Sequence, residues 1–386
     1  MLLDKKMQIG AIVAVVIIVV AAVAVVALNN NNETEVEKKG LYRLDATVVD
    51  VSMGQCSATP GVIITLENIY KAYYGDYVKT GFTIDDVKKD TAFWNEYCEW
   101  SPIATDNGDG TYTVQSTTKA KGTESVIIPV ADAAVSMGTM YSETIYTLLC
   151  YQYGMQPYSE ASLKNENIGK AMSEMVVGGM DYNYYIENEG IFMTAYVDKT
   201  TYLDLGVNSV QKVDAEKLTN VMKSAKGDGK NVIYFGSGTR MSEDKYYAAN
   251  TEPCKNTGTY YAFFGPSAIK DVYASVDAIG KIMGFDQSVI DKSIQDFQIR
   301  LYTVYNSVQE KTSGVTEKQK AYWEAGNGKA VKSSMGSTIL KFLGFDASLM
   351  DGAEHDLESL LFDKPSLLVF YTNDGRSLDE RMRTNL

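Results

Sequence analysis

The sequence predicts an α/β protein with two lobes, each built on a parallel sheet, joined by a single long helix. Three observations support this prediction. Apolar strands alternate with amphipathic helices from about residue 123 to the end, a pattern typical of parallel sheets. One long helical stripe separates an earlier strand–helix series from a later one. A charge-free segment near the amino terminus has the length of a transmembrane helix.

The charge-free segment is "IGAIVAVVIIVVAAVAVVAL", residues 9–28. About 20 apolar residues span a bilayer core, whereas the apolar part of a cleaved signal is typically about 7–15 residues long. Residues 1–28 are therefore expected to be an uncleaved membrane anchor, with cleavage after the Ala-Val-Ala sequence at 22–24 as the alternative. Lys5 and Lys6 stand close to the segment, which favours a cell-membrane protein with its globular part outside the cell.

A polar stalk at residues 29–40 and a small α+β region at 41–122 are expected next. The stalk, "NNNNETEVEKKG", shows no hydrophobic periodicity. The region after it mixes strand-like and helix-like stretches. Its "TDNGDG" sequence puts Gly108 and Gly110 where a calcium loop starting at Asp106 needs oxygen ligands, so a turn is expected there.

The four cysteines are not arranged as a metal or redox motif, because none belongs to a CxxC pair. Outside the membrane an even number of cysteines permits two disulfides. Cys56–Cys98 is the first pairing expected, since both residues lie in the same small region. Four free, buried thiols, with Cys150 and Cys254 included, are the alternative.

The first lobe is predicted at residues 123–286. Its strands lie in "ESVIIPVADAAVSMG" and "NVIYFGSGT". Its helices are "YSETIYTLLCYQYGM", "DAEKLTNVMKSAK" and "SAIKDVYASVDAIGKIMGF", the last of which ends at Gly284. The strands are apolar along their whole length, as expected for strands buried on both faces.

The linking helix is predicted at residues 287–312 and the second lobe at 313–386. The helix carries one apolar stripe with spacings of four and three residues: Ile290, Ile294, Phe297, Leu301, Val304 and Val308. At 1.5 Å per residue it is about 39 Å long. The second lobe follows as a strand in "KAYWEAG", a helix in "SSMGSTILKFLGF" and a strand in "SLLVFYT". The chain ends soon afterwards, so this lobe is expected to have an incomplete sheet.

Composition argues against nucleic-acid binding and against catalysis. The net charge of −13 and the pI near 4.7 oppose affinity for a polyanion. His355 is the only histidine, too few for a hydrolase triad or a histidine-rich metal centre. The "GSG" at 236–238 lacks the lysine of a phosphate-binding loop. No enzyme activity and no cofactor are therefore predicted.

The order of several phrases in the two lobes points to a known family. A glutamate-bearing helix followed by an apolar strand occurs once in each lobe, in "DAEKLTNVMKSAKGDGKNVIYF" and in "DLESLLFDKPSLLVFY". "DVYASVDAIGKIMGFD" precedes the long helix and "KAYWEAGNGKAVKSSMGSTILKFLGFD" opens the second lobe. From about residue 124 to its end the chain resembles the binding proteins that serve ABC importers of ferric siderophores, haem and cobalamin.

Four departures limit this resemblance. Ser366 stands where the family has an aspartate, and a Gly-Asp-Gly loop replaces the Pro-Asp turn in the first lobe. The family's second lobe continues beyond the strand that ends near Tyr371, so this lobe is expected to be either reduced or truncated. Residues 41–122 match no part of it.

The resemblance implies a membrane-anchored extracellular solute-binding protein of an ABC importer. It would capture a ferric siderophore, haem or cobalamin-like ligand between its lobes and deliver it to the permease. The alternative from another class is an anchored cell-surface interaction protein that uses the same fold without transporting a small molecule.

The candidate ligand residues follow strand ends, where loops of both lobes are expected to converge. Arginines there would pair with an anionic chelate, and aromatic rings would stack on a flat ligand. The set comprises Tyr141, Arg240, Trp323, Glu324, Asn373 and Arg376.

The resemblance also implies that Glu216 and Glu358 dock on the permease, because they occupy the glutamate position of the two helix–strand phrases. The alternative is structural, since a glutamate in the first turn of a helix is favoured by the helix dipole.

Overall fold

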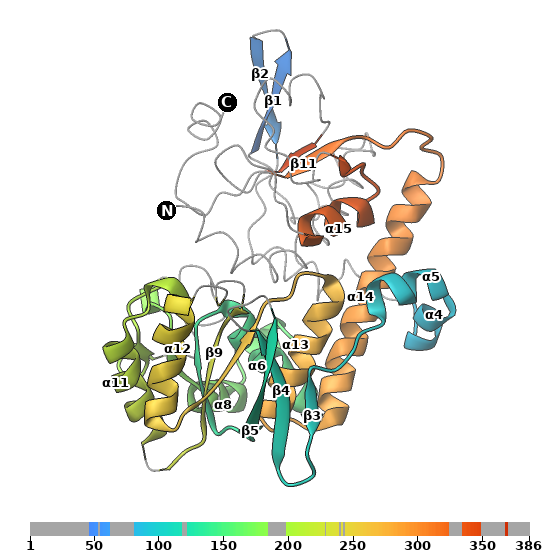
Figure 1. Cartoon of the computed structure of the whole chain (residues 1–386). Helices are drawn as coiled ribbons and strands as arrows, with labels where there is room; N and C mark the ends of the chain where they lie inside the picture. Colours follow the sequence, from blue (N-terminus) through green and yellow to red (C-terminus); the bar gives the residue numbers. More distant parts are fainter. Residues whose placement is uncertain are drawn as a thin grey trace. The chain divides into compact units, whose positions relative to one another are not determined.

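The computed structural model describes residues 46–52, 55–61, 81–117, 122–183, 198–227, 229–238, 241, 244–323, 334–348 and 367–369 (Figure 1). It shows an α/β protein whose chain divides into two compact units. The central unit contains the described part of residues 83–299. The terminal unit contains the described part of residues 46–82 and 300–369. This division differs from the expected boundaries at residues 122 and 286.

The core of the central unit is a sheet of five parallel strands in the order β10-β9-β6-β7-β8. Its strands are β6 (Ala133–Ser136), β7 (Val176–Gly179), β8 (Leu203–Asp204), β9 (Val232–Ser237) and β10 (Tyr260–Phe264). In register, Ala133 of β6 pairs with Val232 of β9, and Ile233 of β9 pairs with Tyr260 of β10. Almost every side chain of β6 and β9 is buried, which explains why both strands are mainly apolar up to their terminal serines, Ser136 and Ser237.

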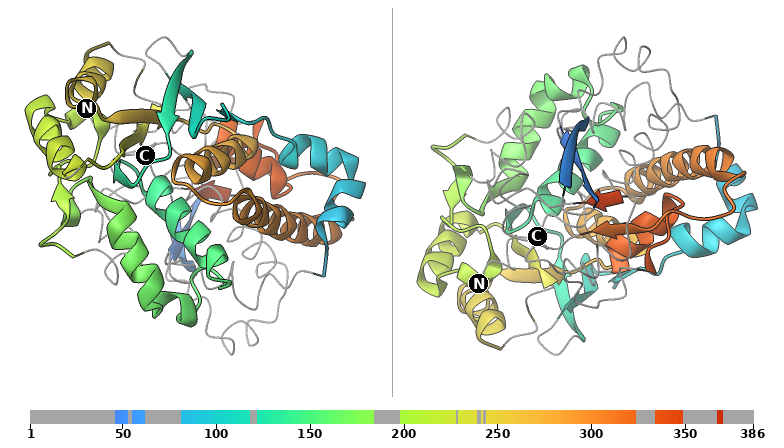
Figure 2. Two further views of the ribbon diagram at one scale, coloured as in Figure 1. Left: turned by 90° about the horizontal axis from the view of Figure 1, so that it is seen from below. Right: turned by 90° about the horizontal axis from the view of Figure 1, so that it is seen from above.

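Helices connect these strands and cover the sheet (Figures 1 and 2). They are α6 (Thr139–Gln152), α7 (Glu160–Leu163), α8 (Glu166–Met175), a 3₁₀ turn at Val210–Lys212, α11 (Ala215–Lys226), α12 (Asp244–Thr257) and α13 (Ile269–Ile282). Helix α6 packs against α8 and α13, while α11 packs against α12. The N-cap of α11 is Asp214, whose carboxylate accepts from Lys217 N at 2.8 Å. Such a cap satisfies an amide that the helix cannot bond internally.

A small antiparallel sheet lies against the edge of the parallel one. It has the order β3-β4-β5, with β3 at Ala104–Asp106, β4 at Thr111–Thr117 and β5 at Thr123–Pro129. Phe263 N of β10 donates to the Ser116 hydroxyl of β4 at 2.9 Å. The Lys281 ammonium of α13 donates to Ala104 O of β3 at 3.2 Å and pairs with the buried Asp277 carboxylate at 2.9 Å.

The expected α+β region is therefore divided between the two units. Residues 83–117 belong to the central unit, whereas the hairpin of β1 (Ala46–Ser52) and β2 (Gln55–Gly61) belongs to the terminal unit. "TDNGDG" forms the expected turn, in which Asp106 and Asp109 accept from the amides of Gly108 and Thr111.

A short helical segment joins the small sheet to α13 and α14. It contains α4 (Ile84–Lys89), α5 (Thr91–Phe93) and a π-helical turn at Trp94–Cys98. Backbone carbonyls of the π turn accept from side chains of the long helices: Lys270 Nζ donates to Asn95 O at 3.0 Å, and Gln298 Nε2 donates to Cys98 O at 3.1 Å. These bonds attach the segment to the central unit.

The cysteines correct the disulfide expectation. Cys98, Cys150 and Cys254 carry free, buried thiols. The Cys56–Cys98 pairing is therefore wrong in this structure, because the Cys98 side chain lies in the core beside the Tyr273 hydroxyl. Spacing in the sequence could not reveal that Cys98 faces the interior.

The predicted limits of the long helix are confirmed, because α14 runs from Gln287 to Thr312. Residues 287–299 belong to the central unit and residues 300–312 to the terminal unit. Its apolar stripe is buried at five of the six predicted positions. Phe297, the sixth, is half-buried and makes an edge contact with Tyr273 at 5.4 Å between ring centroids.

The terminal unit contains a parallel pair of strands, β11 (Ala321–Trp323) and β12 (Leu367–Val369), with α15 (Ser334–Phe342) between them in sequence. The parallel sheet expected in the second lobe is represented among the described residues by this pair of strands, with Ala321 opposite Leu367. The ring of Phe342 packs on Tyr305 of α14 at 5.7 Å.

None of the helices described here is both long and apolar enough to cross a membrane. The expected anchor at residues 9–28 lies outside the described residues.

Candidate functional site

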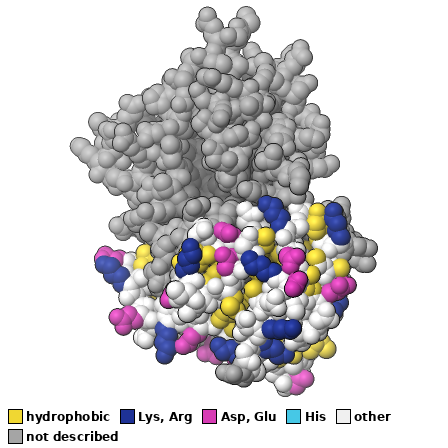
Figure 3. All heavy atoms as spheres, turned by 90° about the vertical axis from the view of Figure 1, so that its left-hand side faces the viewer, with side chains coloured by type: hydrophobic (Ala, Val, Ile, Leu, Met, Phe, Trp, Pro, Cys, Tyr) yellow, Lys and Arg dark blue, Asp and Glu magenta, His cyan; other side chains and the backbone are white. Residues whose placement is uncertain are grey.

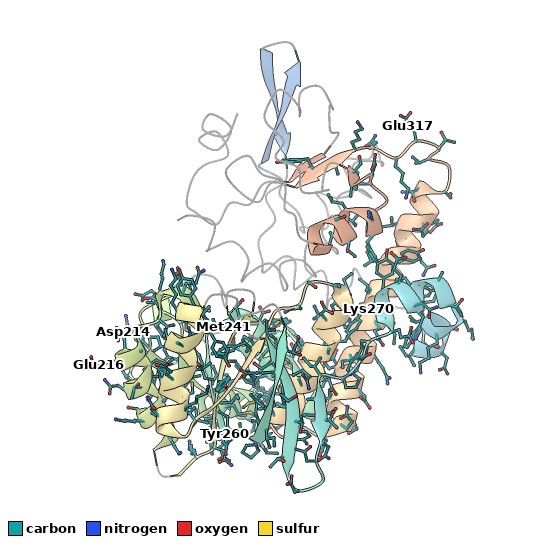
Figure 4. All side chains as sticks on the ribbon, in the orientation of Figure 1. Asp214, Glu216, Met241, Tyr260, Lys270 and Glu317 are labelled. Atoms are coloured by element: carbon teal, nitrogen blue, oxygen red, sulfur yellow. The ribbon has the colours of Figure 1, made fainter. Side chains whose placement is uncertain are left out.

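The candidate site is the carboxyl edge of the five-stranded parallel sheet. In open parallel sheets the loops at this edge bind ligands, because the strands end there together and helices begin there. Figure 4 shows the two edges: Met241, just after β9, lies at the carboxyl edge, and Tyr260, the first residue of β10, lies at the opposite edge. Described residues at the carboxyl edge come from β6, β7, β8, β9 and β10.

The ends of β6 and β7 approach each other unusually closely. Gly179 ends β7 with φ +146°, and a Cβ at this position would overlap the Ser136 carbonyl oxygen. Ser136 O accepts from Met180 N at 3.1 Å, and the Ser136 hydroxyl donates to Gly138 O at 2.7 Å. Only glycine permits this close approach of the two strand ends.

Helix α6 begins at this edge. Its N-cap residue is Gly138, which supplies no side-chain cap, and its first turn contains no acidic residue. The positive end of the helix dipole is therefore not neutralised by a carboxylate of its own first turn. This arrangement favours neutral or anionic groups over cations near the end of β6.

Tyr141 holds strand ends together from within the core. Its hydroxyl donates to Gly236 O of β9 and accepts from Phe264 N of β10 at 3.2 Å. Its ring stacks on Phe235, with centroids 4.9 Å apart and planes within 5°. The side chain is 1% exposed, and burial raises the pKa of Tyr141.

The stacking role expected for Tyr141 is therefore corrected. The Tyr141 ring is covered by protein, and its hydroxyl already has two backbone partners. The residue positions the candidate site and does not line it. The sequence could not show this, because Gly236 and Phe264 are far from Tyr141 along the chain.

Sequence reasoning missed a group of methionines at the same edge. Met137 follows β6, Met140 lies in the first turn of α6, Met180 follows β7, and Met241 comes after β9. All four are buried. Thioether side chains are flexible and polarisable, and they fill irregular spaces beneath adaptable surfaces. The signal was present in the phrases "SMGTM" and "GGM", each directly after a strand.

Most of the other predicted ligand residues lie outside the described residues, namely Arg240, Glu324, Asn373 and Arg376. Trp323 is the last residue of β11, as predicted, but its side chain is also outside the described part. These five residues remain predictions.

Glu216 lies where the sequence placed it, in the first turn of α11. Figure 4 shows Glu216 and Asp214 at the margin of the central unit, directed away from it. The Glu216 side chain is exposed. It is not needed as a cap, because Asp214 already caps the helix. Glu358 lies outside the described residues.

The described surface has mixed charge. On the face in Figure 3, basic side chains are interspersed with acidic ones. Among the described side chains no group of three or more His, Cys, Asp or Glu could hold a metal ion. His355 is outside this part of the chain. The predicted absence of catalysis and of a cofactor remains a prediction.

Comparison with known proteins gives little beyond this geometry. No protein-family model matches the chain, and no curated protein matches it. A solved structure with a similar arrangement is the periplasmic solute binding protein from Veillonella parvula DSM 2008. It is 13% identical with a TM-score of 0.41, and the match covers 66% of this chain and 68% of that chain. A likeness at that level carries no argument about function.

Proposed function

We propose that this protein is a solute-binding protein of an ABC importer, which takes up its ligand at the carboxyl edge of the central sheet. The observation that carries the proposal is the convergence of five parallel strand ends on one edge, where Gly179 lets β6 and β7 approach closely and Tyr141 bonds to β9 and β10. The order of elements around the single long helix, already visible in the sequence, supports the same assignment.

The ligand class we propose is an iron chelate, haem or a cobalamin-like corrinoid. Two features support it. The first turn of α6 contains no carboxylate, which leaves the positive end of the helix dipole favourable to an anion, and methionines are buried at the same edge. An anionic ligand with a broad apolar face would match both features.

The test is a pair of tryptophan substitutions at opposite edges of the sheet. Ser237 is the half-buried last residue of β9 at the carboxyl edge, and Lys230 is exposed just before the amino end of the same strand. We expect Ser237→Trp to weaken binding by at least 10-fold through steric exclusion. Lys230→Trp should leave affinity unchanged, since ligands bind at the other edge.

Calorimetric titration with ferric siderophores, haem and cobalamins gives the measurement. If no compound in the panel binds the wild-type chain, the transport assignment is wrong. If a ligand binds but Lys230→Trp weakens it as much as Ser237→Trp, the site lies elsewhere.

We further propose that residues 9–28 anchor the chain in the cell membrane with the globular part outside. The support is the length of the charge-free segment and its flanking lysines. The full chain should remain in the membrane fraction after a high-pH carbonate wash, and protease added to intact cells should degrade it. Release of a shortened protein into the medium would contradict the anchor.

The second candidate function is that of an anchored surface interaction protein. The small sheet favours it, because β5 exposes Thr123, Ser125 and Ile127 to solvent on a face that is no part of the candidate ligand site. Solute binding with no associated permease, or no solute binding at all, would favour this alternative.

A further inference from the structure

Strand β5 is a regular edge strand whose outer side is unpaired in the described structure. It ends the order β3-β4-β5, and its seven residues pair with β4 without a bulge. The small sheet stands at the outer side of the central unit (Figure 2). Natural edge strands are usually short, bulged or charged, because an open edge invites pairing with another strand. None of these protections applies to the central part of β5.

The backbone groups that face outward can be identified from the hydrogen bonds of β4. Gln115 N donates to Ile103 O, so the backbone amide and carbonyl groups of the odd-numbered residues of β4 point toward β3. Val130 N donates to Gly110 O, so the backbone groups of the even-numbered residues of β4 point toward β5. In an antiparallel sheet this alternation continues along each strand. The amide and carbonyl groups of three alternate β5 residues therefore point to the open edge: Thr123, Ser125 and Ile127.

The side chains of these residues lie on the outward face and carry no charge. Ile127 is 64% exposed, and Thr123 and Ser125 are exposed as well. Their partners on β4 are Thr117, Gln115 and Thr113, with Gln115 Nε2 donating to Ser125 Oγ at 2.9 Å. The outward face of β4 and β5 is thus uncharged in a protein with a net charge of −13.

The one charged residue of β5 is directed to the opposite face. Glu124 accepts a hydrogen bond from the Tyr247 hydroxyl of α12. The Glu124 carboxylate is therefore bonded within its own chain and does not project from the outward face. Two copies of this acidic chain can bring their β5 edges together without opposing carboxylates on that face.

We propose that two copies of this chain associate through antiparallel pairing of their β5 strands. The pairing is centred on Ser125, which lies opposite its own counterpart across a two-fold axis. In this register Thr123 of each copy lies opposite Ile127 of the other, a favourable pair of β-branched residues. About six backbone hydrogen bonds form, and the two small sheets become one sheet of six strands. Pairing of edge strands is an established way for chains to associate.

Cysteine substitution tests the register. Across the pair the two Ser125 Cα atoms lie about 5.5 Å apart, within the range for a disulfide. Thr113 on β4 shares the same outward face, but the two copies of β4 are about 14 Å apart at strand spacing. In the full-length chain, mild oxidation should crosslink Ser125→Cys and leave Thr113→Cys as uncrosslinked as the wild type. The wild-type chain sets the background from its four native cysteines.

Proline substitution tests the backbone bonds. Ser125→Pro removes an outward amide that β4 does not use, and proline is tolerated on an open edge. Ser125→Ala removes the same side-chain hydrogen bond but keeps the amide. Sedimentation equilibrium of the detergent-dispersed full-length chain should show that Ser125→Pro weakens dimerisation more than about 30-fold, while Ser125→Ala leaves it nearly unchanged.

Three results would overturn the proposal. The first is a wild-type chain that stays monomeric at about 100 µM, a concentration at which even a weak interface is occupied. The second is crosslinking of Thr113→Cys as efficient as that of Ser125→Cys, and the third is an equal effect of the alanine and proline variants. The first would show a closed edge, the second a face-to-face contact or random collision, and the third a contact made by side chains alone. Solute binding is measured separately, so its failure would not affect these outcomes.

Discussion

Replacement of Tyr141 by phenylalanine tests the assignment of this residue to the support of the sheet. The substitution keeps the ring that stacks on Phe235 and removes only the hydroxyl. Gly236 O then loses its donor and Phe264 N its acceptor, both in a region without solvent. A buried polar group left unpaired costs about 1–3 kcal/mol. We therefore expect Tyr141→Phe to lower the free energy of unfolding by about 2–3 kcal/mol.

Urea unfolding followed by near-ultraviolet circular dichroism measures the loss, and the melting temperature should fall by roughly 2–4 °C. Tyr153→Phe is the matched control, because Tyr153 follows the same helix and is 42% exposed. Its effect should be within about 0.5 kcal/mol. If Tyr141→Phe is as mild as the control, the hydroxyl does not support the strand ends. If it is as stable as wild type but loses ligand, Tyr141 lines the site after all.

Three further predictions concern other parts of the molecule. Lys281→Met should cost about 2–4 kcal/mol in urea unfolding, because it leaves the Asp277 carboxylate buried without its cation; a change below 1 kcal/mol would show that the pair is not stabilising. Burial raises the pKa of the Cys98 thiol to about 12 from a usual value of 9.0. The unfolded chain alone ionises this thiol between pH 9 and 12, so stability should fall as pH rises through that range, and less so in Cys98→Ala. Glu216→Lys combined with Glu358→Lys should leave solute affinity and melting temperature nearly unchanged but reduce uptake strongly; normal uptake would exclude permease docking.

The sequence predicted those elements whose pattern is local and strong. The long helix was placed at its observed limits because Ile290, Ile294 and Leu301 repeat at helical spacing. Strand β9 was predicted from its apolar run, and α11 from the helical stretch that precedes the glycine-rich loop before β9. These features depend on neighbouring residues alone.

Features that depend on distant residues were not predicted. Helix α12 was not identified, since Pro253 lies inside it and its sequence is polar. The role of Tyr141 depends on backbone groups of two strands that come much later in the chain. The location of the ligand site at a sheet edge remains a prediction, and which side chains line that edge depends on packing that periodicity does not encode.

The position of the small sheet has a consequence for how this fold tolerates deletion. A parallel sheet ends in a strand with unused backbone groups, and β10 is that strand here. Ser116 of β4 bonds to its Phe263 amide, and Thr117 packs against Gly238 at the end of β9. A shortened chain that lacks residues 83–129 would keep every strand of the central sheet and yet expose this margin, together with the apolar side of α13. Such a chain would be expected to accumulate as insoluble aggregates when expressed. Residues 83–129 are therefore expected to protect the central sheet from aggregation.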